Sequence, residues 1–335
     1  MNLKQGGTMN YRHLGKSGLK VSELSFGSWV TYHNQVDIEN AKQLMAAAWE
    51  RGVNFFDNAE AYANGESEKI MGRALRELGW AREQYLVSTK IFWGGKTPNE
   101  VGLSFKHIVE GVDRSLRNLG LDHVDLVFAH RPDPETPIEE TVRAFNHVIN
   151  QGKAFYWGTS EWPAEAILKA AKIAKKLDLI GPTMEQPEYN LLHRTRFEQE
   201  YDILFKKLGL GTTTWSPLKS GMLTGKYRKG TFPEGSRANL PGFDWLKEMF
   251  SDPNRVQAVE NLAQIADNLG VSLAQLSLAW ILKNPNVSTV ITGASKISQL
   301  EENFKALDVV PMLTDEIMAW IEEALVGYSD DTKVN

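Results

Sequence analysis

Short apolar stretches alternate with helical patterns along almost the whole chain. The clearest stretch, at 53–57, is apolar until it ends on Asp57, which is typical of a buried parallel strand. Seven further strands, alternating with predicted helices, are predicted at 24–27, 85–90, 124–129, 154–159, 183–185, 211–214 and 287–291. Eight such units after a predicted β-hairpin at 11–24 favour an α/β fold, a (β/α)8 TIM barrel, over its alternative, an open parallel sheet.

Local signals define the ends of several predicted helices. Asp37 is predicted to cap the first helix, and capping boxes are predicted at 136–139, with Pro137 in the first helical position, and at 272–275. A less regular pattern at 195–207 predicts another helix. The segment 218–254, after the seventh strand, is rich in Gly, Pro and aromatic residues, and its length is typical of a lid or binding loop.

No linker divides the chain, so we expect one domain over 10–326, with extra helices at its end and flexible tails at 1–9 and 327–335. The net charge of −5, from 37 basic and 42 acidic residues, argues against nucleic acid as a partner. The chain has no cysteine, no apolar leader at 1–9 and no apolar run of membrane-spanning length. We therefore expect a cytoplasmic protein that is not inserted in a membrane. No metal-ligand spacing is found, so no metal site is predicted.

The strand ends carry the candidate chemistry, because the carboxyl ends of barrel strands meet at one mouth. Asp57, Tyr62, Lys90 and His130 would bring together a carboxylate, a phenol, an ammonium and an imidazole. Each alone has a structural explanation: Asp57 as a turn residue, Tyr62 as a rim aromatic and His130 as a satisfied buried histidine. Their occurrence together favours catalysis.

These four side chains suit the reduction of a carbonyl group. An ammonium beside Tyr62 is expected to lower the phenol pKa toward working pH, so that the phenol gives a proton to a developing alkoxide. An imidazole can orient the carbonyl oxygen. None of these groups supplies a hydride, so a cofactor is required. Lys90 as the Schiff-base lysine of an aldolase is an alternative, disfavoured because Asp57 would keep the amine protonated.

Phosphate-binding signals are weaker. No GxGxxG motif follows a strand, and the P-loop-like segment 221–227 is one residue short and lacks the final Ser or Thr. Gly293, before a predicted helix, can seat a phosphate on backbone amides. Lys226 and Arg237 can pair with another phosphate, or they are solvated loop charges.

These residues make the sequence resemble an aldo-keto reductase. The matching motifs are Asn-Phe-Phe-Asp at 54–57 with Tyr62, Ser-Thr-Lys at 88–90, His-Arg-Pro-Asp at 130–133 and Thr-Trp-Ser-Pro-Leu at 214–218. The motifs at 92–96, 106–111, 148–152 and 156–160 resemble more closely the branch containing the voltage-gated potassium-channel β subunits and their plant, fungal and bacterial relatives. The resemblance covers residues 10–326.

The resemblance implies bound NADPH or NADP+, a small carbonyl substrate and a catalytic tetrad of Asp57, Tyr62, Lys90 and His130. It implies that Trp215 stacks on the nicotinamide and that Arg237 lies at the adenosine end, where it would select NADPH over NADH. The implied cofactor contacts are Ser28, Trp29, Gln35, Asp57, Ser160, Gln186, Trp215, Ser216, Pro217, Leu218, Lys219, Ser220, Lys226, Arg237, Gly293, Ser295, Gln299, Glu302 and Asn303.

Four positions depart from the animal channel subunits. Glu161 stands where they tend to carry Arg, and Lys219 and Ser220 replace small residues. His130 replaces their Asn, which favours a working enzyme. We therefore expect an NADPH-dependent reductase of aldehydes and ketones. The alternative is a channel β-subunit-like regulatory protein with slow or vestigial turnover. The branch also implies a homo-oligomer, a tetramer, and a possible channel partner.

Overall fold

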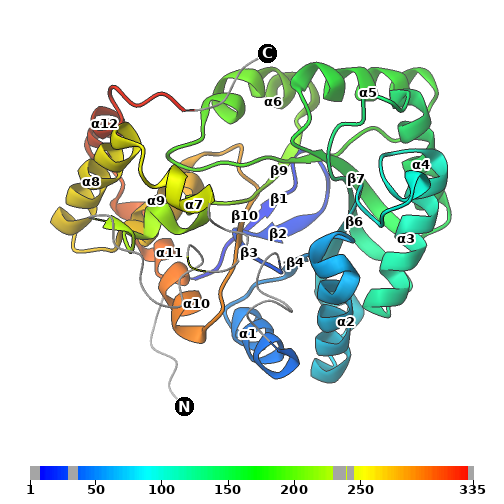
Figure 1. The fold of residues 1–335 in the computed structure, drawn as a ribbon, viewed down its shortest axis with the longest axis horizontal. Helices are drawn as coiled ribbons and strands as arrows, with labels where there is room; N and C mark the ends of the chain where they lie inside the picture. Colours follow the sequence, from blue (N-terminus) through cyan, green and yellow to red (C-terminus); the bar gives the residue numbers. More distant parts are fainter. Residues whose placement is uncertain (1–7, 29–36, 229–238, 240–244, 331–335) are drawn as a thin grey trace.

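The computed structural model describes residues 8–28, 37–228, 239 and 245–330. Eight parallel strands close into a barrel in the order β10-β3-β4-β5-β6-β7-β8-β9, which confirms the (β/α)8 prediction and rules out the open sheet (Figure 1). The barrel strands are β3 (Leu24–Gly27), β4 (Phe55–Asp57), β5 (Leu86–Ile91), β6 (Val124–Ala129), β7 (Ala154–Ser160), β8 (Met184–Gln186), β9 (Gly211–Thr214) and β10 (Thr289–Thr292).

Helices surround the barrel, and their buried apolar side chains belong to the large apolar cluster outside the strands. The helices are α1 (Ile38–Glu50), α2 (Glu66–Leu78), α3 (Phe105–Leu119), α4 (Ile138–Asn150), α5 (Ala164–Lys176), α6 (Asp202–Leu208), α7 (Trp245–Met249), α8 (Pro253–Asn268), α9 (Leu273–Lys283), α10 (Ile297–Phe304), α11 (Ala306–Val309) and α12 (Asp315–Ala324).

The predicted hairpin is present and closes the amino end of the barrel. It consists of β1 (Tyr11–His13) and β2 (Lys20–Ser22), which pair antiparallel. Its turn lies against the start of β9: Lys16 N donates to Gly209 O at 2.9 Å, and a Cβ on Gly15 would lie 2.3 Å from Gly211 N. The hairpin is also tied to the far end of the sequence. The Arg12 guanidinium donates to the carbonyls of Leu282 (2.7 Å), Val287 (2.9 Å) and Asn284 (3.2 Å).

Side chains alternate between the two faces of the barrel strands, and this alternation separates two apolar clusters. Phe56 and Val127 belong to the large cluster between the strands and the helices. The small cluster, inside the barrel, consists of Leu14, Phe55, Leu126, Phe128 and Met184. Leu14 comes from the hairpin and closes the amino end of the barrel, which we call its lower end. Toward the carboxyl ends of the strands the inward positions become polar, and this change places the site.

The predicted helix starts are partly confirmed. Asp37 caps α1 by accepting from Asn40 N at 3.0 Å, and the capping box at 272–275 is present at the start of α9. The capping box predicted at 136–139 is wrong: α4 begins at Ile138 with Pro137 as its N-cap and no side-chain cap. The Thr136 hydroxyl instead donates to Asp133 Oδ2 at 2.7 Å, so that it does not reach the helix amides.

Two other regions differ from simple expectation. The helix expected at 195–207 is divided into a π-helical segment, Arg196–Glu200, and α6. Near the expected tails, Met9 is buried, and Asp330 Oδ2 accepts from the backbone amides of Arg194 and Thr195, both at 2.7 Å.

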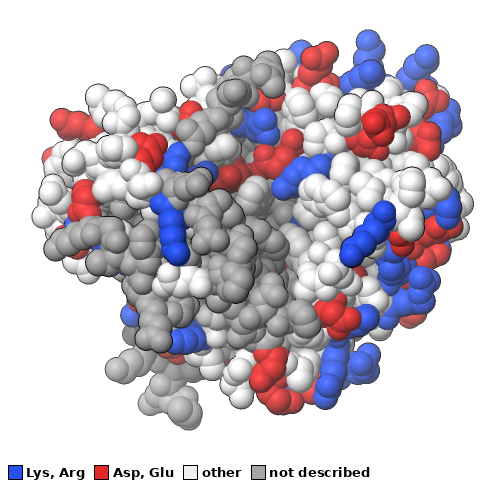
Figure 2. All heavy atoms as spheres, in the orientation of Figure 1, with Lys and Arg blue, Asp and Glu red and all other residues white. Residues whose placement is uncertain are grey.

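Surface charge is mixed on the face drawn in Figure 2, where Lys and Arg side chains lie among Asp and Glu side chains. Within the described ranges, no single helix has the length and apolar composition to cross a membrane; only α8 and α9 together reach them, and they are bent by 93°. In the same ranges no group of His, Asp and Glu residues has the arrangement of a metal site.

Candidate active site

Asp57 and Lys90 form an ion pair inside the mouth of the barrel. Lys90 Nζ lies 2.6 Å from Asp57 Oδ2, and both side chains are almost completely buried. The other carboxylate oxygen, Oδ1, accepts from Ser88 Oγ at 2.7 Å and from Gln186 Nε2 at 3.1 Å. Burial disfavours the Lys90 ammonium, but Asp57 and Tyr62 outweigh this cost and raise the pKa of Lys90. The amine therefore stays charged, which agrees with the argument against a Schiff-base lysine.

Tyr62 is held against this ammonium by an unusual turn. Lys90 Nζ lies 3.0 Å from the phenolic oxygen of Tyr62 and also donates to Asn58 O at 2.9 Å. The turn, Tyr62–Gly65, contains Ala63 and Asn64 in the left-handed region, with φ values of 50° and 53°. Non-glycine residues adopt this conformation at an energetic cost, so the surrounding structure must stabilise it.

The expected lowering of the Tyr62 pKa is not found. Burial of the phenol raises its pKa above the ordinary value, and the opposing effect of the Lys90 charge is smaller. Burial destabilises phenolate more than the nearby ammonium stabilises it, because Asp57 already neutralises much of that ammonium. Tyr62 is thus held in its protonated form, which is the form that donates a proton.

His130 completes the group directly after β6. Its backbone amide donates to Ile91 O at 3.0 Å, and its ring centroid lies 5.9 Å from that of Tyr62. The imidazole is buried, and burial together with the charges of Lys90 and Arg131 places its pKa well below the usual value. It is therefore neutral near pH 7, and a neutral imidazole still offers one N–H to a carbonyl oxygen. In the described part of the chain, His130 Nδ1 has no hydrogen-bond partner.

Glu60 holds in place the loop that carries Tyr62, and sequence analysis did not identify this role. Its buried carboxylate accepts from Phe92 N and from Arg114 Nη2, both at 2.8 Å. It thereby joins the loop that carries Tyr62 to the segment after β5 and to α3. A Cβ on Gly94 would lie 1.8 Å from Arg114 Nη2 and 2.7 Å from Glu60 Oε2, so a larger residue here would require this pair to move.

Several predicted cofactor residues lie at neighbouring strand ends. Ser28 follows β3, and its hydroxyl donates to Asp57 O at 2.9 Å. Ser160 ends β7, and its hydroxyl donates to Gln186 O, also at 2.9 Å. The half-buried Trp215 follows β9, and its indole Nε1 donates to Glu161 Oε1 at 2.9 Å. Glu161 thus fixes the orientation of the indole, a role that its place in the sequence did not reveal.

The segment after Trp215 is tightly turned. Ser216, Lys219 and Ser220 have φ values of 54°, 44° and 54°, and Pro217 and Leu218 lie between them. Lys219 Nζ is already paired with Glu188 Oε1 at 2.8 Å, so its ammonium is partly neutralised. The backbone amides of Lys219 and Gly221 are bonded to Ser216 O at 3.0 Å and to Leu218 O at 2.8 Å, which stabilises the shape of this turn.

The remaining predicted contacts lie on the other side of the mouth or outside the described residues. Lys226 Nζ lies 4.9 Å from the Tyr227 ring centroid, and no acidic residue pairs with it in the parts of the chain that are described. Gly293 and Ser295 precede α10, and Ser295 N donates to Gln299 Oε1 at 2.9 Å. Farther along α10, Glu302 Oε1 accepts from Gln275 Nε2 at 2.7 Å, and Asn303 is buried. Trp29, Gln35 and Arg237 lie outside the described residues.

These residues fit a nicotinamide dinucleotide. Ser160 and Gln186 offer polar groups beside the Asp57–Lys90 pair, and the half-buried Trp215 is fixed by Glu161. The Lys226 ammonium and the amides before α10 provide donors for phosphate groups.

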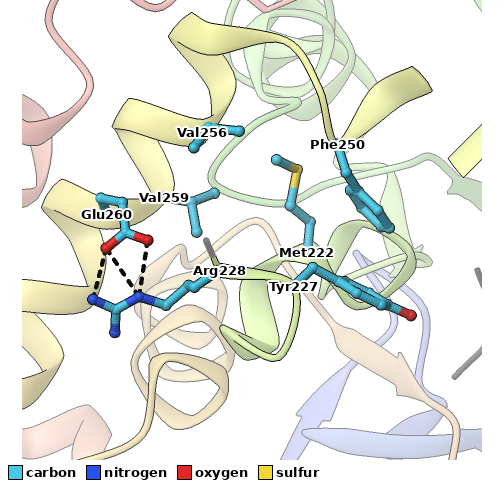
Figure 3. Close-up of a pocket in the computed structure, with 7 residues that line it drawn as sticks. All are labelled: Met222, Tyr227, Arg228, Phe250, Val256, Val259 and Glu260. Carbon is cyan, nitrogen blue, oxygen red and sulfur yellow. Dashed lines mark hydrogen bonds and ion pairs between the residues drawn. The ribbon is translucent and has the colours of Figure 1, made fainter. Parts of the chain in front are cut away.

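A small pocket lies between the segment around Tyr227 and helix α8 (Figure 3). It is lined by Met222, Tyr227, Arg228, Phe250, Val256, Val259 and Glu260. Arg228 Nη2 donates to Glu260 Oε2 at 2.7 Å, which ties the segment carrying Lys226 to α8. None of the four candidate catalytic residues reaches this pocket, so we interpret it as part of the packing of the long segment.

Comparison with known proteins agrees with this arrangement. The family model "Aldo/keto reductase family" matches residues 23–326. A "Probable voltage-gated potassium channel subunit beta" of Oryza sativa subsp. japonica is 57% identical over 314 residues, 94% of this chain and 96% of that protein. A protein of the same name from Arabidopsis thaliana is 56% identical over 317 residues, 95% and 97% of the two chains.

A fungal relative is somewhat more distant. The "Putative voltage-gated potassium channel subunit beta" of Schizosaccharomyces pombe is 50% identical over 321 residues, 94% of this chain and 93% of that protein. The barrel, its polar mouth and these matches lead to one conclusion: the chain belongs to the aldo/keto reductase family, a family of oxidoreductases that generally use nicotinamide cofactors.

Proposed function

We propose that the protein reduces aldehydes and ketones to alcohols with NADPH as the reductant. The reaction is carbonyl plus NADPH plus one proton, giving alcohol plus NADP+. The observation that carries the proposal is the bonded series Asp57–Lys90–Tyr62 beside a neutral His130. Four groups with complementary proton chemistry at one mouth support acid catalysis better than any structural role.

The four side chains have distinct tasks in this mechanism. The bound cofactor supplies the hydride. Tyr62 donates the proton that the carbonyl oxygen takes up, and Lys90 stabilises the phenolate that remains. Asp57 keeps Lys90 charged and directs its ammonium toward the phenol. His130 donates a hydrogen bond to the carbonyl oxygen and so orients the substrate.

The preference for NADPH over NADH is also part of the proposal. The two cofactors differ by one ribose phosphate, and an arginine can bind phosphate through two parallel hydrogen bonds. Arg237 is expected to bind this phosphate, and Lys226 is expected to face the pyrophosphate. Arg237→Ala should weaken NADPH binding by about tenfold or more and should leave NADH binding nearly unchanged.

A regulatory role is the second candidate, because the plant and fungal relatives carry the name of potassium-channel β subunits. In that role the protein would be a cytoplasmic tetramer that binds a channel and turns its nucleotide over slowly. The complete proton-donating group, including His130, favours turnover as the main activity.

A screen of NADPH oxidation separates the two candidates. Purified protein would be mixed with NADPH and short aldehydes, methylglyoxal, quinones or aromatic aldehydes, and the loss of NADPH absorbance would be followed. Carbonyl-dependent oxidation supports the reductase. Tight NADPH binding without oxidation in the presence of any of these carbonyls would support the regulatory role.

A further inference from the structure

Arg131 lies at the mouth of the barrel, next to the residues to which we assign the chemistry. It follows His130, and its Nη1 atom donates to His130 O at 2.6 Å and to Ser160 Oγ at 3.3 Å. Its charge acts on both Tyr62 and His130, since it favours deprotonation of each. The guanidinium is therefore close to the position where a carbonyl must bind.

Most of the donors of this guanidinium are unused. Arginine has five N–H donors, but Nε and Nη2 of Arg131 make no hydrogen bond within the described ranges, and no carboxylate pairs with it there. The side chain is nevertheless half-buried. A partly desolvated cation with free donors is more stable when an anion binds to it.

The nearby carboxylates are committed to other partners. Asp133, two residues later, accepts from Leu103 N, Glu135 N and Thr136 Oγ1. Glu161, directly after Ser160, accepts from Trp215, from Glu188 N and from Arg196. Asp57 is paired with Lys90. Each of these carboxylates satisfies another donor, so Arg131 stays available to an anion from outside.

Trp93 makes a cation–π contact with this guanidinium. The Arg131 guanidinium lies 5.6 Å from the Trp93 ring centroid, and the same ring lies 5.2 Å from the His130 ring in an edge-on arrangement. One aromatic ring thus touches both the charged group and the group that is expected to orient the carbonyl. The N–H donors of a guanidinium lie in its own plane, so its contact with an aromatic ring does not use them.

We propose that Arg131 binds an anionic group, a carboxylate or a phosphate, on the carbonyl substrate. The inference rests on the proposed reductase function and names its substrate class: aldehydes or ketones that carry a negative charge a few bonds from the carbonyl. In this role Arg131 determines specificity, whereas Tyr62 and His130 act on the reacting oxygen.

Matched substrate pairs test the proposal. One pair is 4-carboxybenzaldehyde and its methyl ester; the other is glyceraldehyde 3-phosphate and glyceraldehyde. The ratio of kcat/KM for the anionic member to kcat/KM for the neutral member would be measured in wild type and in Arg131→Met. We expect Arg131→Met to lower this ratio by about tenfold or more, mainly through KM. Arg131→Lys should restore part of it, because a lysine keeps the charge but loses the two-pronged geometry.

Arg143→Met is the matched control. Arg143 is an exposed arginine on α4, paired with Glu139, so the substitution changes the net charge equally, far from the mouth. It should leave both ratios at the wild-type value. The pair with the larger loss in Arg131→Met shows whether carboxylate or phosphate is the better fit.

Three results would overturn the inference and leave the proposed function intact. Equal wild-type kcat/KM values within both pairs would show that the site does not distinguish anionic from neutral substrates. An unchanged ratio in Arg131→Met would assign the discrimination elsewhere. Weaker NADPH binding in Arg131→Met, with an equal loss for charged and neutral substrates, would place the arginine on the cofactor. If wild type reduces neither member of any pair, the proposed function itself fails, and this inference fails with it.

Discussion

The two ends of the barrel interior are built by the same strands but differ completely in character. At the lower end, Phe55, Leu126 and Phe128 pack with Leu14 of the hairpin and exclude charge. Two residues farther along β4, the inward position is Asp57, paired with Lys90 on β5. Because inward positions recur every second residue, one step of that period separates a sealed apolar end from a charged one.

This difference shows how one interior serves both stability and chemistry. The apolar end requires only good packing, whereas every polar atom at the other end needs a partner. Asp57 has three donors, from Lys90, Ser88 and Gln186, and Gln186 also donates to Thr213 Oγ1 at 3.1 Å. The polar end is thus a hydrogen-bonded network. Removing one of its members leaves another polar group without a partner, whereas truncating an apolar side chain at the other end leaves a cavity.

The largest effect is expected for Tyr62→Phe at the polar end. The substitution removes only the phenolic hydroxyl, so kcat for carbonyl reduction should fall by roughly 10²–10⁴-fold. NADPH affinity, measured by quenching of tryptophan fluorescence, should stay near the wild-type value. If the variant keeps most of the wild-type kcat, Tyr62 is not the proton donor.

Lys90→Met should affect stability as well as turnover. It leaves Asp57 as a buried charge without its counter-ion, so the free energy of unfolding should fall by about 3–5 kcal/mol. Adding Asp57→Asn removes that charge and should recover most of the lost stability, without restoring activity. Urea denaturation of the single and double variants measures both effects. A double variant that is no more stable than Lys90→Met would show that the charge is not the cause.

Leu126→Ala tests the apolar end in the same way. It leaves a cavity beneath the network and should lower the free energy of unfolding by about 2–5 kcal/mol. The kcat of the folded enzyme should remain close to wild type, because Leu126 packs in the apolar cluster and not in the polar network. A large loss of kcat in fully folded Leu126→Ala would mean that packing at the apolar end affects the catalytic groups at the polar end.

A smaller effect is expected for Glu60, which positions the Tyr62 loop but does not belong to the proposed catalytic group. Glu60→Gln removes the charge that pairs with Arg114 but keeps a group that can accept from Phe92 N. Slight displacement of the Tyr62 loop should lower kcat by roughly tenfold without changing NADPH affinity.

Glu68→Gln is the control for Glu60→Gln. Glu68 is another buried carboxylate, which accepts from Thr89 and Asn118, and its burial raises its pKa. It makes no hydrogen bond to the Tyr62 loop, so this variant should keep the wild-type kcat. Equal losses in the two variants would reduce the role of Glu60 to general packing.

The smallest effect concerns pH. His130 has a folded-state pKa well below its usual value, so below pH 6.5 the unfolded chain binds a proton that the folded chain does not. Its contribution to stability therefore decreases as the pH falls, by about 1 kcal/mol at pH 5.5. In His130→Asn the loss of stability between pH 7.5 and pH 5.5 should be smaller by this amount, as measured by urea denaturation. An identical loss in both proteins would show that His130 does not titrate differently on folding.

Much of this arrangement was predictable because it follows from strand periodicity. Strand ends share one mouth, so Asp57, Lys90 and His130 were expected to meet, and the structure brings them together. Ser88 was within reach of the same reasoning, because it lies two residues before Lys90 and faces the same way.

Other features depend on contacts that no spacing encodes. Glu60 meets Arg114 across 54 residues, and Glu161 meets Trp215 across the same separation. The pKa of Tyr62 depends on the balance of burial against charge, and a sequence gives no measure of burial. Thr136 has the right spacing for a cap, but Asp133 attracts its hydroxyl.

The tie between the two ends of the sequence has a consequence during synthesis. β3 pairs with β10, and Arg12 bonds to carbonyls about 270 residues later, so the barrel cannot close before β10 is made. At about 5–20 residues per second, a ribosome needs roughly 15–60 s to reach that point. Throughout this time the open edges of β3 and of the newest strand lack their final neighbours. Nascent chains stalled before residue 289 should therefore be the form that chaperones bind most strongly, and release should follow once β10 has emerged.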